Sequence, residues 1–454
     1  MKIDCMKKIR LLIVNILMVI ITSMGLSSDS IGQNNFQEQE KINKLTFLSV
    51  KGNKIIDENG KEIALKGFHF DSFYTFRKDI YDAIKSANRD PDDINIELSK
   101  YFFSDYDIRE FKHLGANVVR IGIRLWEIED KPFSVSEKSL KHLDNTINKW
   151  GGNGIYVILD LHAAGQNDLS HNREYGNILW EIDQFQNRVI ALWDIIANRY
   201  KDNPYIAGYD IINEPQAPTR ESLHSFYIKT IKKIRETDKK HIIILEWDEK
   251  RQQEFYFGGK YDDSNIVYSI HFYKPGKFTN QGINNSQTGY KYPGKYGGIY
   301  WDKNQINKYF SEVLSNIDKP LFIGEFGAAY KGGGQDSFQW ISDVISVLNN
   351  NGIHYTYFSY KSPMKNSLGF YQPIDNIVQR IEYLNKAIRN KKIRIDEIKE
   401  EYKKIAHTEN NYESPQKLRQ ILIKGFILDN SVSPYQKHYG FEHTQSELYF
   451  LELC

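Results

Sequence analysis

The run GIYVILDL at residues 154–161 is followed, after a polar stretch, by IAGYDIIN at residues 206–213. Both runs are continuous in Ile, Val and Leu rather than alternating with polar residues, which indicates strands buried on both faces, as in a parallel sheet. Between them, residues 186–200 carry apolar side chains at helical spacing. A buried strand, an amphipathic helix and a second buried strand form the repeating unit of an α/β fold.

The same alternation of strand and helix continues on both sides of this unit. Further apolar runs predict strands at 63–70, 117–123, 241–247, 266–273, 320–326 and 353–358. Helical patterns occur at 105–114, where Gly115 is the expected C-cap, and at 221–235 and 337–349. Eight strands with intervening helices predict a (β/α)8 TIM barrel over residues 45–390. An open doubly wound sheet is the alternative, but no nucleotide-binding glycine motif follows the first strand.

The two ends of the chain differ from this body. Residues 1–30 have a basic start, an apolar centre and small residues after it, which predicts a signal peptide; an uncleaved membrane anchor is the alternative. Residues 31–44 read as a linker, and residues 391–454 as a charged C-terminal extension without an assigned role. The expected location is therefore outside the cell, at its surface or in the periplasm.

Composition excludes several classes of protein. The chain has 454 residues, 41% hydrophobic and 26% charged, which argues against a disordered chain, a polytopic membrane protein and a coiled coil. A net charge of +2 gives no electrostatic case for nucleic acid. Its two cysteines, Cys5 and Cys454, lie at opposite ends, so the body has neither a disulfide framework nor a CxxC metal motif. Aromatics make up 14% of the chain, which suits carbohydrate stacking and an aromatic core alike.

Polar side chains mark the carboxyl ends of the predicted strands, where the chemistry of a TIM barrel is located. They are Arg120 and Arg124, Asp160 and His162, Asn213 and Glu214, Glu246 and Trp247, His271 and Tyr273, and Glu325. A core strand has no packing reason to end in a carboxylate, because burying one unpaired is costly. Glu214 and Glu325, on opposite sides of one barrel, predict facing carboxylates, the arrangement that glycoside hydrolysis uses.

Five motifs in order resemble glycoside hydrolase family 5. They are VVRIGI (118–123), ILDLHAAGQN (158–167), IAGYDIINEPQAP (206–218), SIHFYKP (269–275) and PLFIGEFGA (320–328). A lone NEP triplet is a weak signal, but five ordered motifs at barrel-like intervals are specific. The resemblance covers about residues 60–375 and implies a TIM barrel that hydrolyses β-linked glycans with retention of configuration, without a metal or other cofactor.

The resemblance also implies residue roles. Glu214 is expected to be the general acid/base, Glu325 the nucleophile, and Asn213 the partner of the sugar 2-hydroxyl. Supporting positions around the reacting sugar are implied for Arg120, His162, His271 and Tyr273. The family usually has Trp at the end of the eighth strand, where this chain has Phe358, which has less area and no indole N–H.

Other aromatic side chains are candidates for binding a glycan by stacking on its sugar rings. Trp126 and Trp301 follow strands or lie in loops, so they are expected either to stack on sugar or to pack in the core. The long insertion at 274–301 is expected to form one wall of a groove, and the insertion at 73–102 the other.

These observations favour a secreted, monomeric endo-β-1,4-glucanase whose partner is a β-glucan. An exo-β-1,3-glucanase, a β-mannanase or a glycolipid glycosidase on the same barrel is the alternative, because loop geometry decides among them. A metal-dependent hydrolase using Asp160, His162 and His271, and a catalytically silent glycan-binding protein, are two further hypotheses.

Overall fold

The computed structural model describes residues 44–70, 82, 84–86, 88, 90–163, 178–362, 367–390 and 394–427. The predicted signal peptide at 1–30, the linker up to residue 43 and residues 428–454 of the predicted extension lie outside this range. Among the helices that are described, none combines the length and the apolar composition that crossing a membrane requires.

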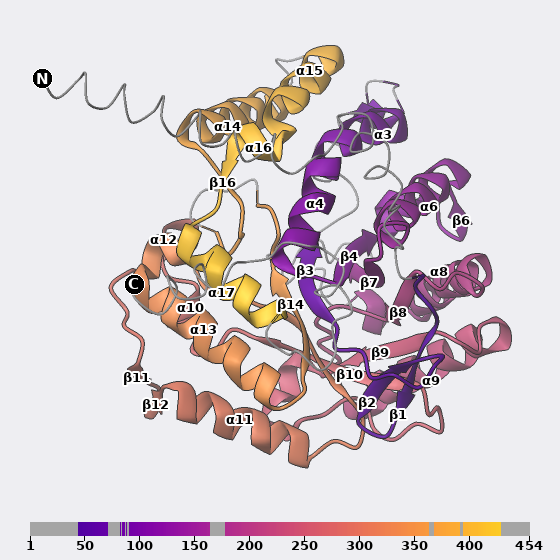
Figure 1. Ribbon diagram of the computed structural model, residues 1–454. Helices are drawn as coiled ribbons and strands as arrows, with labels where there is room; N and C mark the ends of the chain where they lie inside the picture. Colours follow the sequence, from indigo (N-terminus) through magenta and orange to yellow (C-terminus); the bar gives the residue numbers. More distant parts are fainter. Residues whose placement is uncertain are drawn as a thin grey trace, which may run out of the picture. The chain divides into compact units, whose positions relative to one another are not determined.

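Eight parallel strands close into a barrel (Figure 1). In order around it they are β3 (Lys66–Phe70), β4 (Val118–Arg124), β7 (Tyr156–Ala163), β8 (Ile206–Asp210), β9 (Ile242–Glu246), β10 (Ile266–Phe272), β13 (Leu321–Phe326) and β14 (His354–Phe358). β14 pairs back onto β3, so the sheet has no free edge. This confirms the predicted (β/α)8 barrel and removes the open sheet as an alternative.

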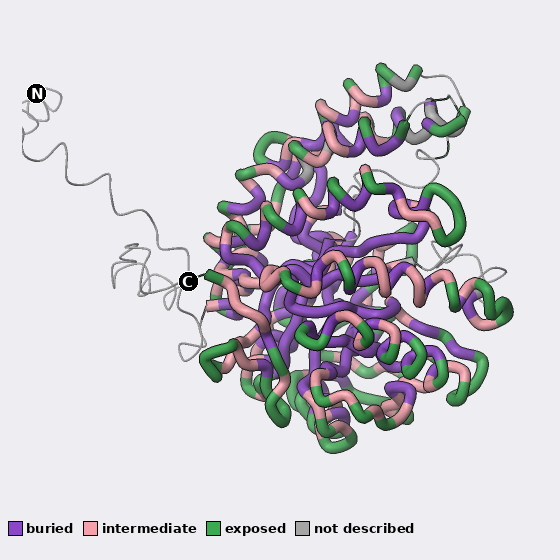
Figure 2. The backbone as a smooth tube through the Cα atoms, turned by 90° about the vertical axis from the view of Figure 1, so that its right-hand side faces the viewer, coloured by how far each residue is buried: buried purple, intermediate pink, exposed green. Residues whose placement is uncertain are grey.

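Helices surround the barrel and bury one face against it. They are α4 (Asp105–Leu114), α6 (Glu137–Gly151), α8 (Asp183–Tyr200), α9 (Arg220–Thr237), α11 (Lys303–Ser315), α13 (Gln335–Asn350) and α17 (Gln416–Ile427). Figure 2 shows the strands buried at the centre and the exposed residues on the outward faces of the helices. The alternation of strands and helices therefore places a continuous apolar layer between the sheet and the surrounding helices.

One helix of the expected alternation is missing. The connection between β9 and β10 is described throughout, and it contains the short 3-10 helix η2 (Glu249–Glu254) in place of an α-helix. Asp248 begins this turn by accepting a hydrogen bond from the backbone N–H of Lys250. The shortened connection places Glu249 only three residues after the end of β9, close to the strand end.

Helix α4 shows how local sequence fixes an element. The side chain of Ser104 caps the backbone N–H of Asp107, and the Asp107 carboxylate accepts from the Ser104 backbone, which completes a capping box. At the other end Gly115 adopts φ 81°, the left-handed conformation that glycine favours. The predicted bounds 105–114 and the predicted C-cap are confirmed.

The amino-terminal end of the barrel is sealed by apolar residues. The hairpin of β1 (Leu48–Lys51) and β2 (Lys54–Asp57) lies at this end (Figure 1). Leu48 and Ile55 of the hairpin join a buried cluster with Leu65, Val118, Tyr156, Ile158, Ala207, Ile242, Ile244, Val267 and Phe322. Water is thereby excluded from one end of the barrel, and only the opposite end remains for polar chemistry.

The carboxyl-terminal segment completes the ring of helices. α17 packs between α13 and α4, so it occupies the position of the eighth barrel helix. The ring of Phe426 lies edge-on to Phe68 of β3 at 5.4 Å, and the Lys66 side chain donates to the Gly425 carbonyl at 3.4 Å. The domain boundary predicted at residue 390 therefore does not match the packing, because residues 416–427 belong to the barrel.

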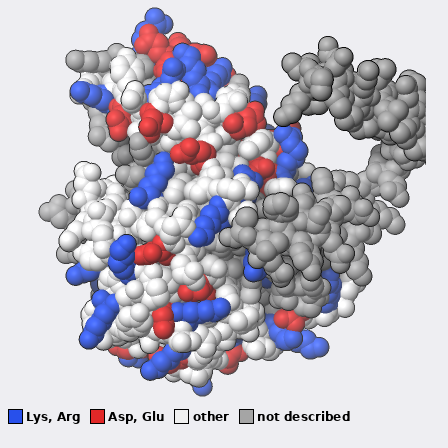
Figure 3. All heavy atoms as spheres, turned by 60° about the vertical axis from the view of Figure 1, so that its left-hand side comes forward, with Lys and Arg blue, Asp and Glu red and all other residues white. Residues whose placement is uncertain are grey.

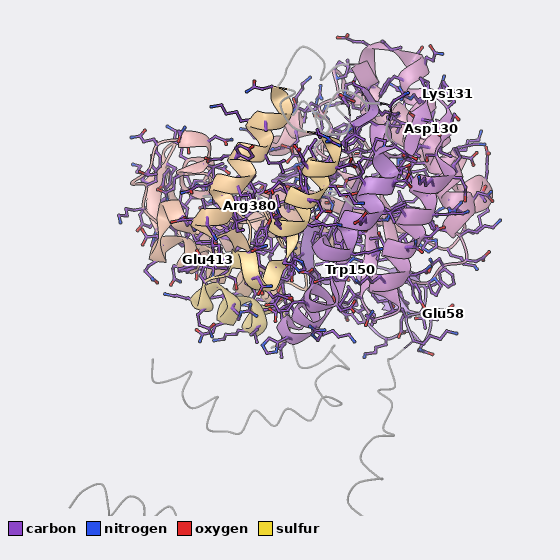
Figure 4. All side chains as sticks on the ribbon, turned by 90° about the horizontal axis from the view of Figure 1, so that it is seen from above. Glu58, Asp130, Lys131, Trp150, Arg380 and Glu413 are labelled. Carbon is purple, nitrogen blue, oxygen red and sulfur yellow. The ribbon has the colours of Figure 1, made fainter. Side chains whose placement is uncertain are left out.

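An additional helical layer precedes α17. α14 (Asp375–Arg389) and α15 (Ile395–Ala406) lie beside α3 (Pro91–Phe102), at the opposite end from the β1–β2 hairpin (Figure 1). Lys399 and Lys403 of α15 both pair with Glu97 of α3. Figure 3 shows basic and acidic side chains interspersed at the top of the view, and Figure 4 labels Arg380 and Glu413 on this segment. The helix is thus anchored by ion pairs rather than freely exposed.

Shorter elements fill the connections. They are α5 (Leu125–Ile128), β5 (Glu129–Lys131), β6 (Ser134–Val135), α7 (Ile178–Glu181), α10 (Gly276–Thr279), η3 (Ile283–Asn285), β11 (Gly294–Tyr296), β12 (Ile299–Trp301), α12 (Tyr330–Gly333), β15 (Gln372–Pro373), α16 (Thr408–Asn411) and β16 (Tyr412–Glu413). The insertion at 274–301 therefore holds the hairpin β11–β12, and the insertion at 73–102 holds α3.

Candidate active site

Charged side chains line the carboxyl end of the barrel. Along a strand, the inward-facing residues are apolar at the amino end and become polar or charged toward the carboxyl end. In β9, Ile242 and Ile244 belong to the sealed apolar end, and the next inward residue is Glu246. In β7, Ile158 lies in the apolar cluster, and Asp160 and then His162 follow at the same two-residue spacing. Each strand thus delivers its polar residue to one common layer.

Arg120 of β4 is the centre of this layer and is fully buried. Its guanidinium donates to Asp210 at 2.9 Å, to Glu246 at 2.8 Å and to Glu325 at 3.1 Å. It also donates to Asn213 at 3.0 Å and pairs with Asp160 at 3.0 Å. Burial disfavours its charge, but the carboxylates outweigh burial and hold the pKa of Arg120 well above its usual value. The guanidinium therefore stays cationic and fixes the surrounding carboxylates.

Asp210, at the end of β8, balances the charge of this cluster. It is fully buried, and its carboxylate accepts from Nε of Arg120. Burial raises the pKa of Asp210 well above the usual value, and the nearby Glu246 and Asp160 raise it further. The charge of Arg120 opposes this shift, so Asp210 depends on the guanidinium as much as the other carboxylates do.

Glu325 near the end of β13 receives two donors. Tyr273 donates its hydroxyl to Oε2 at 2.8 Å, and Arg120 donates to Oε1 at 3.1 Å. Only 5% of Glu325 is exposed. The neighbouring Gly324 leaves room for His271, because a Cβ at this position would lie 3.0 Å from the imidazole Nε2. Glu325 is therefore held in one orientation by groups on β4 and β10.

Glu214 lies after the end of β8 and is the more open carboxylate, with 38% of its side chain exposed. Its backbone has φ 46°, in the left-handed region that non-glycine residues seldom adopt. The backbone N–H of Glu214 donates to Oε2 of Glu246 at 2.7 Å, and its side chain forms a hydrogen bond with Nδ1 of His271 at 2.8 Å. The backbone turn thus presents this carboxylate toward the open end of the barrel.

Glu214 and Glu325 face each other across His271. One carboxylate oxygen from each and one ring nitrogen of His271 all lie within 4.8 Å of one another. His271 Nδ1 is also 3.6 Å from Glu325 Oε2. Two carboxylates at this separation can act on the same atom of a small molecule.

Burial and charge set the protonation of these three groups. Burial opposes the charge of His271, but Glu246, Glu325 and Glu214 hold its pKa well above the usual value. Burial favours protonation of Glu214, yet the hydrogen bond to His271 outweighs it and lowers the pKa of Glu214. Burial raises the pKa of Glu325, against the opposing charges of His271 and Arg120. These shifts favour a proton on His271 next to an ionised Glu214.

The other predicted site residues at the strand ends are gathered here as well. His162 Nδ1 is 2.7 Å from Asp160 Oδ2, and Asn213 accepts from Arg120. The Phe358 ring stacks on His69 at 5.2 Å and lies edge-on to Tyr273 at 6.5 Å. Phe358 therefore presents a ring at the base of the site, next to Glu325 and its hydroxyl donor.

The two tryptophans predicted as stacking platforms are placed differently. Trp301 at the end of β12 is only 5% exposed and packs near Phe272 and Tyr309, with ring centroids 6.3 Å away in each case. A ring covered in this way has no face for a sugar, so the stacking role expected of Trp301 is corrected to core packing. Trp126 in α5 is half-buried against the main core cluster.

Three further residues belong to the site and were not among the candidates. His69 lies 3.0 Å from Nη1 of Arg120, and Asp210 is the partner already described. Glu249 is half-buried and accepts from the indole N–H of Trp247 at 2.5 Å. Burial and the charge of Glu214 raise the pKa of Glu249 to about 7. Inward alternation along β3 and β8 was the signal available for His69 and Asp210.

Several of these groups have the composition of metal ligands. They are His69, Asp160 and His162; Glu214, His271 and Glu325; and Asp160, Asp210 and Glu246. In the third group the Arg120 guanidinium bonds to all three carboxylates and already supplies the cation. The first two groups adjoin the same guanidinium through His69 and Glu325, so a divalent ion there would meet a fixed positive charge.

Comparison with known proteins gives a family match. The model of the cellulase family, glycosyl hydrolase family 5, matches residues 78–363. A β-xylosidase of Phanerodontia chrysosporium is 28% identical over 351 residues, which cover 70% of this chain and 71% of that protein. An endoglucanase of Paenibacillus polymyxa is 24% identical over 69% of this chain and 79% of that protein.

Solved structures give the same fold. A mutant form of Thermotoga maritima Cel5A in complex with cellobiose matches with a TM-score of 0.54 and 22% identity. The match covers 79% of this chain and 96% of the Cel5A chain. At this identity the likeness concerns the arrangement of strands and helices.

Proposed function

Since the chain belongs to glycosyl hydrolase family 5, we propose that it is a retaining β-glucanase of the endo-β-1,4 type that uses Glu214 and Glu325 in a double displacement. The observation that carries this proposal is the separation of the two carboxylates. One oxygen of each lies within 4.8 Å of one oxygen of the other, which is compatible with the roughly 5–5.5 Å between carboxyl groups that favours retention over the roughly 6.5–9.5 Å typical of inversion.

In the first step, Glu325 attacks the anomeric carbon, the bond from that carbon to the glycosidic oxygen breaks, and Glu214 protonates the departing oxygen. Tyr273 and Arg120 keep Glu325 oriented, because both donate to it. In the second step, Glu214 takes a proton from water, the water oxygen bonds to the anomeric carbon, and the bond to Glu325 breaks. The sugar is released with its original configuration.

Glu214 needs a proton before the first step. Its source in this proposal is His271, whose raised pKa favours the protonated ring and whose Nδ1 is hydrogen-bonded to Glu214 at 2.8 Å. Binding of an uncharged sugar displaces water from Glu214, which raises the proton affinity of its carboxylate. Transfer from Nδ1 to Oε1 then loads the acid in place, and His271 serves as the proton reservoir.

Two observations bear on the substrate. The endoglucanases among the relatives favour a β-1,4-glucan, whereas the β-xylosidase and a probable glucan 1,3-β-glucosidase from Emericella nidulans, 24% identical, favour exo-acting alternatives. β-Mannanase and glycolipid glycosidase activities use the same two carboxylates. The basic and apolar pattern of residues 1–30 supports export of the enzyme, and we propose that it acts as a monomer.

A substrate panel tests the proposal. We expect hydrolysis of carboxymethyl cellulose and cello-oligosaccharides, with a faster fall in viscosity than release of reducing ends. Proton NMR during the first minutes should show the β-anomer as the initial product. Preferred release of glucose from laminarin would favour the exo-β-1,3 alternative, an α-anomer would contradict retention, and inactivity on every β-glycan would refute the proposed function.

A further inference from the structure

Glu246 is the last residue of β9, and none of its side chain is exposed. The mechanism above gives it no step. A buried carboxylate without a role is costly, since the effective penalty for removing an ion from water is several kcal/mol. Its contacts show what the charge does.

The two oxygens of Glu246 reach both halves of the site. Oε1 accepts from Nη2 of Arg120 at 2.8 Å and lies 3.2 Å from Nε2 of His271. Oε2 accepts the backbone N–H of Glu214 at 2.7 Å. One carboxylate therefore accepts two hydrogen bonds and lies within ion-pair distance of a third nitrogen, and each of these nitrogens belongs to a residue that the proposed reaction uses.

The hydrogen bond from the backbone N–H of Glu214 to Glu246 stabilises a strained turn. Glu214 has φ 46°, which costs a residue with a side chain on the order of 1–2 kcal/mol. The N–H that Glu246 binds belongs to this residue, so the bond stabilises the turn that aims the Glu214 carboxylate. Without it, the backbone of Glu214 would be free to return to a common conformation.

The contact between Glu246 and His271 favours the protonated form of the imidazole ring. The ring has Glu214 at Nδ1 and Glu246 at Nε2, so a carboxylate faces each nitrogen and the doubly protonated ring is favoured. The other charged groups around the ring are Glu325, 3.6 Å from Nδ1, and Arg120, which shares Glu246 with it. Glu249 adds a charge on the Glu214 side. Glu246 is the carboxylate on the side of the ring away from the reaction.

We propose that Glu246 is a positioning residue for the general acid: it holds the backbone of Glu214 in its strained turn and keeps His271 protonated beside it. The inference rests on the proposed function. It predicts that Glu246 acts on proton donation to the leaving group more than on attack by Glu325.

A series of aryl and alkyl β-cellobiosides separates these two contributions. Glu246→Gln keeps the shape, but its amide NH2 group would face donors, so at least one of the three contacts is lost. We expect kcat/KM to fall on the order of 10²-fold for leaving groups that need protonation, and less than about tenfold for 2,4-dinitrophenolate, which leaves without it. The basic limb of the pH profile should move to lower pH, because His271 loses a negative neighbour.

The control lies at the other end of the same strand. Asp238, just before β9, is also buried and binds a histidine, His241, at 2.6 Å and a backbone N–H. Asp238→Asn removes a comparable carboxylate far along the strand from the site, and it should change neither the leaving-group dependence nor the pH profile. Circular dichroism verifies that each variant is folded. If Glu246→Gln does not fold, Glu246→Asp retracts the same carboxylate and should show the same dependence.

Two results would overturn the inference. One is an equal loss for all leaving groups, which would assign Glu246 to the nucleophile side through Arg120. The other is a wild-type rate with every substrate. Failure of the wild-type enzyme to hydrolyse any β-glycoside would instead refute the proposed function, so the two failures are distinguishable.

Discussion

The two ends of the barrel are built from the same strands and have opposite chemistry. At the amino end, Ile158, Ile242 and Ile244 pack in a buried apolar cluster beneath the β1–β2 hairpin. One inward position further along, the same strands carry Asp160 and Glu246, which surround Arg120. A step of two residues, roughly 7 Å, separates a region whose burial stabilises the fold from one whose burial costs free energy.

This difference separates stability from activity along each strand. Apolar burial is stabilising wherever it occurs, so the amino end needs only good packing. The charged end is tolerated because Arg120 and its donors compensate most of the carboxylates, and because the rest of the barrel supplies the stability. We therefore expect substitutions at one end to act on folding and substitutions at the other to act on catalysis.

The strongest test removes Glu325. Glu325→Ala should lower kcat on the order of 10⁴-fold or more, because no other group in the site can bond to the anomeric carbon. Azide should restore turnover and yield the α-glycosyl azide, detected by NMR, because it enters the space left by the nucleophile. Glu214→Ala is the matched control, for which azide should yield the β-glycosyl azide. Unchanged activity in Glu325→Ala would refute its role.

A substitution at the apolar end should give the reverse pattern. Ile244 is 3% exposed. Ile244→Ala should lower the free energy of unfolding by about 2–5 kcal/mol through the lost contacts and the cavity left behind. Urea unfolding measures this change, while kcat below the unfolding transition should stay within about threefold of wild type. A large loss of kcat in the folded variant would contradict the expectation that the amino end affects only stability.

Glu249 tests whether the charged end destabilises the fold. Its pKa is raised to about 7, so between pH 4.5 and 7 the folded protein holds a proton that the unfolded chain releases. Stability from this group is therefore present at low pH and lost as pH rises through 7. Glu249→Gln should exceed wild type in free energy of unfolding by about 1–3 kcal/mol at pH 8.5, with no difference at pH 4. Equal stability at both pH values would contradict the assignment.

The smallest expected effect is that of chelation. Because Arg120 supplies the cation among Asp160, Asp210 and Glu246, dialysis of the enzyme against a chelator should leave kcat/KM unchanged. Re-addition of Mg²⁺, Ca²⁺ or Zn²⁺ serves as the control and should also have no effect. A loss that one of these ions restores would favour the metal-dependent hypothesis and contradict a purely carboxylate-based mechanism.

The sequence alone predicts an element correctly where the contacts that determine it lie within or next to that element. The bounds of α4 follow from Ser104, Asp107 and Gly115, which lie within or next to the helix. The barrel strands follow from buried apolar runs, and the polar strand ends follow from the rule that active sites lie at the carboxyl end of such barrels. Composition and spacing therefore predicted the barrel and the set of side chains that it gathers.

Contacts between distant segments were not predictable in this way. Trp301 is buried because Phe272 and Tyr309 lie against it, and an isolated loop tryptophan gives no sign of such neighbours. Asp210 and Glu246 are the last residues of apolar strands, and their role appears only when Arg120 from β4 reaches them. Likewise, the mixed charges of residues 385–404 favour an exposed helix when the sequence is considered alone, whereas Glu97, far away in sequence, pairs with Lys399 and Lys403 of this stretch.

The position of α17 has a consequence for how the chain is made. The ammonium group of Lys66 and the carbonyl of Gly425 meet across 359 residues of sequence, next to the contact between Phe68 and Phe426. At translation rates of about 5–20 residues per second, the first strand waits roughly 20–70 s for the helix that covers it. The apolar seam between α4 and α13 is covered only when α17, which begins 66 residues after the end of α13, has been made. The helix that covers the first strand is thus made after all eight strands of the barrel.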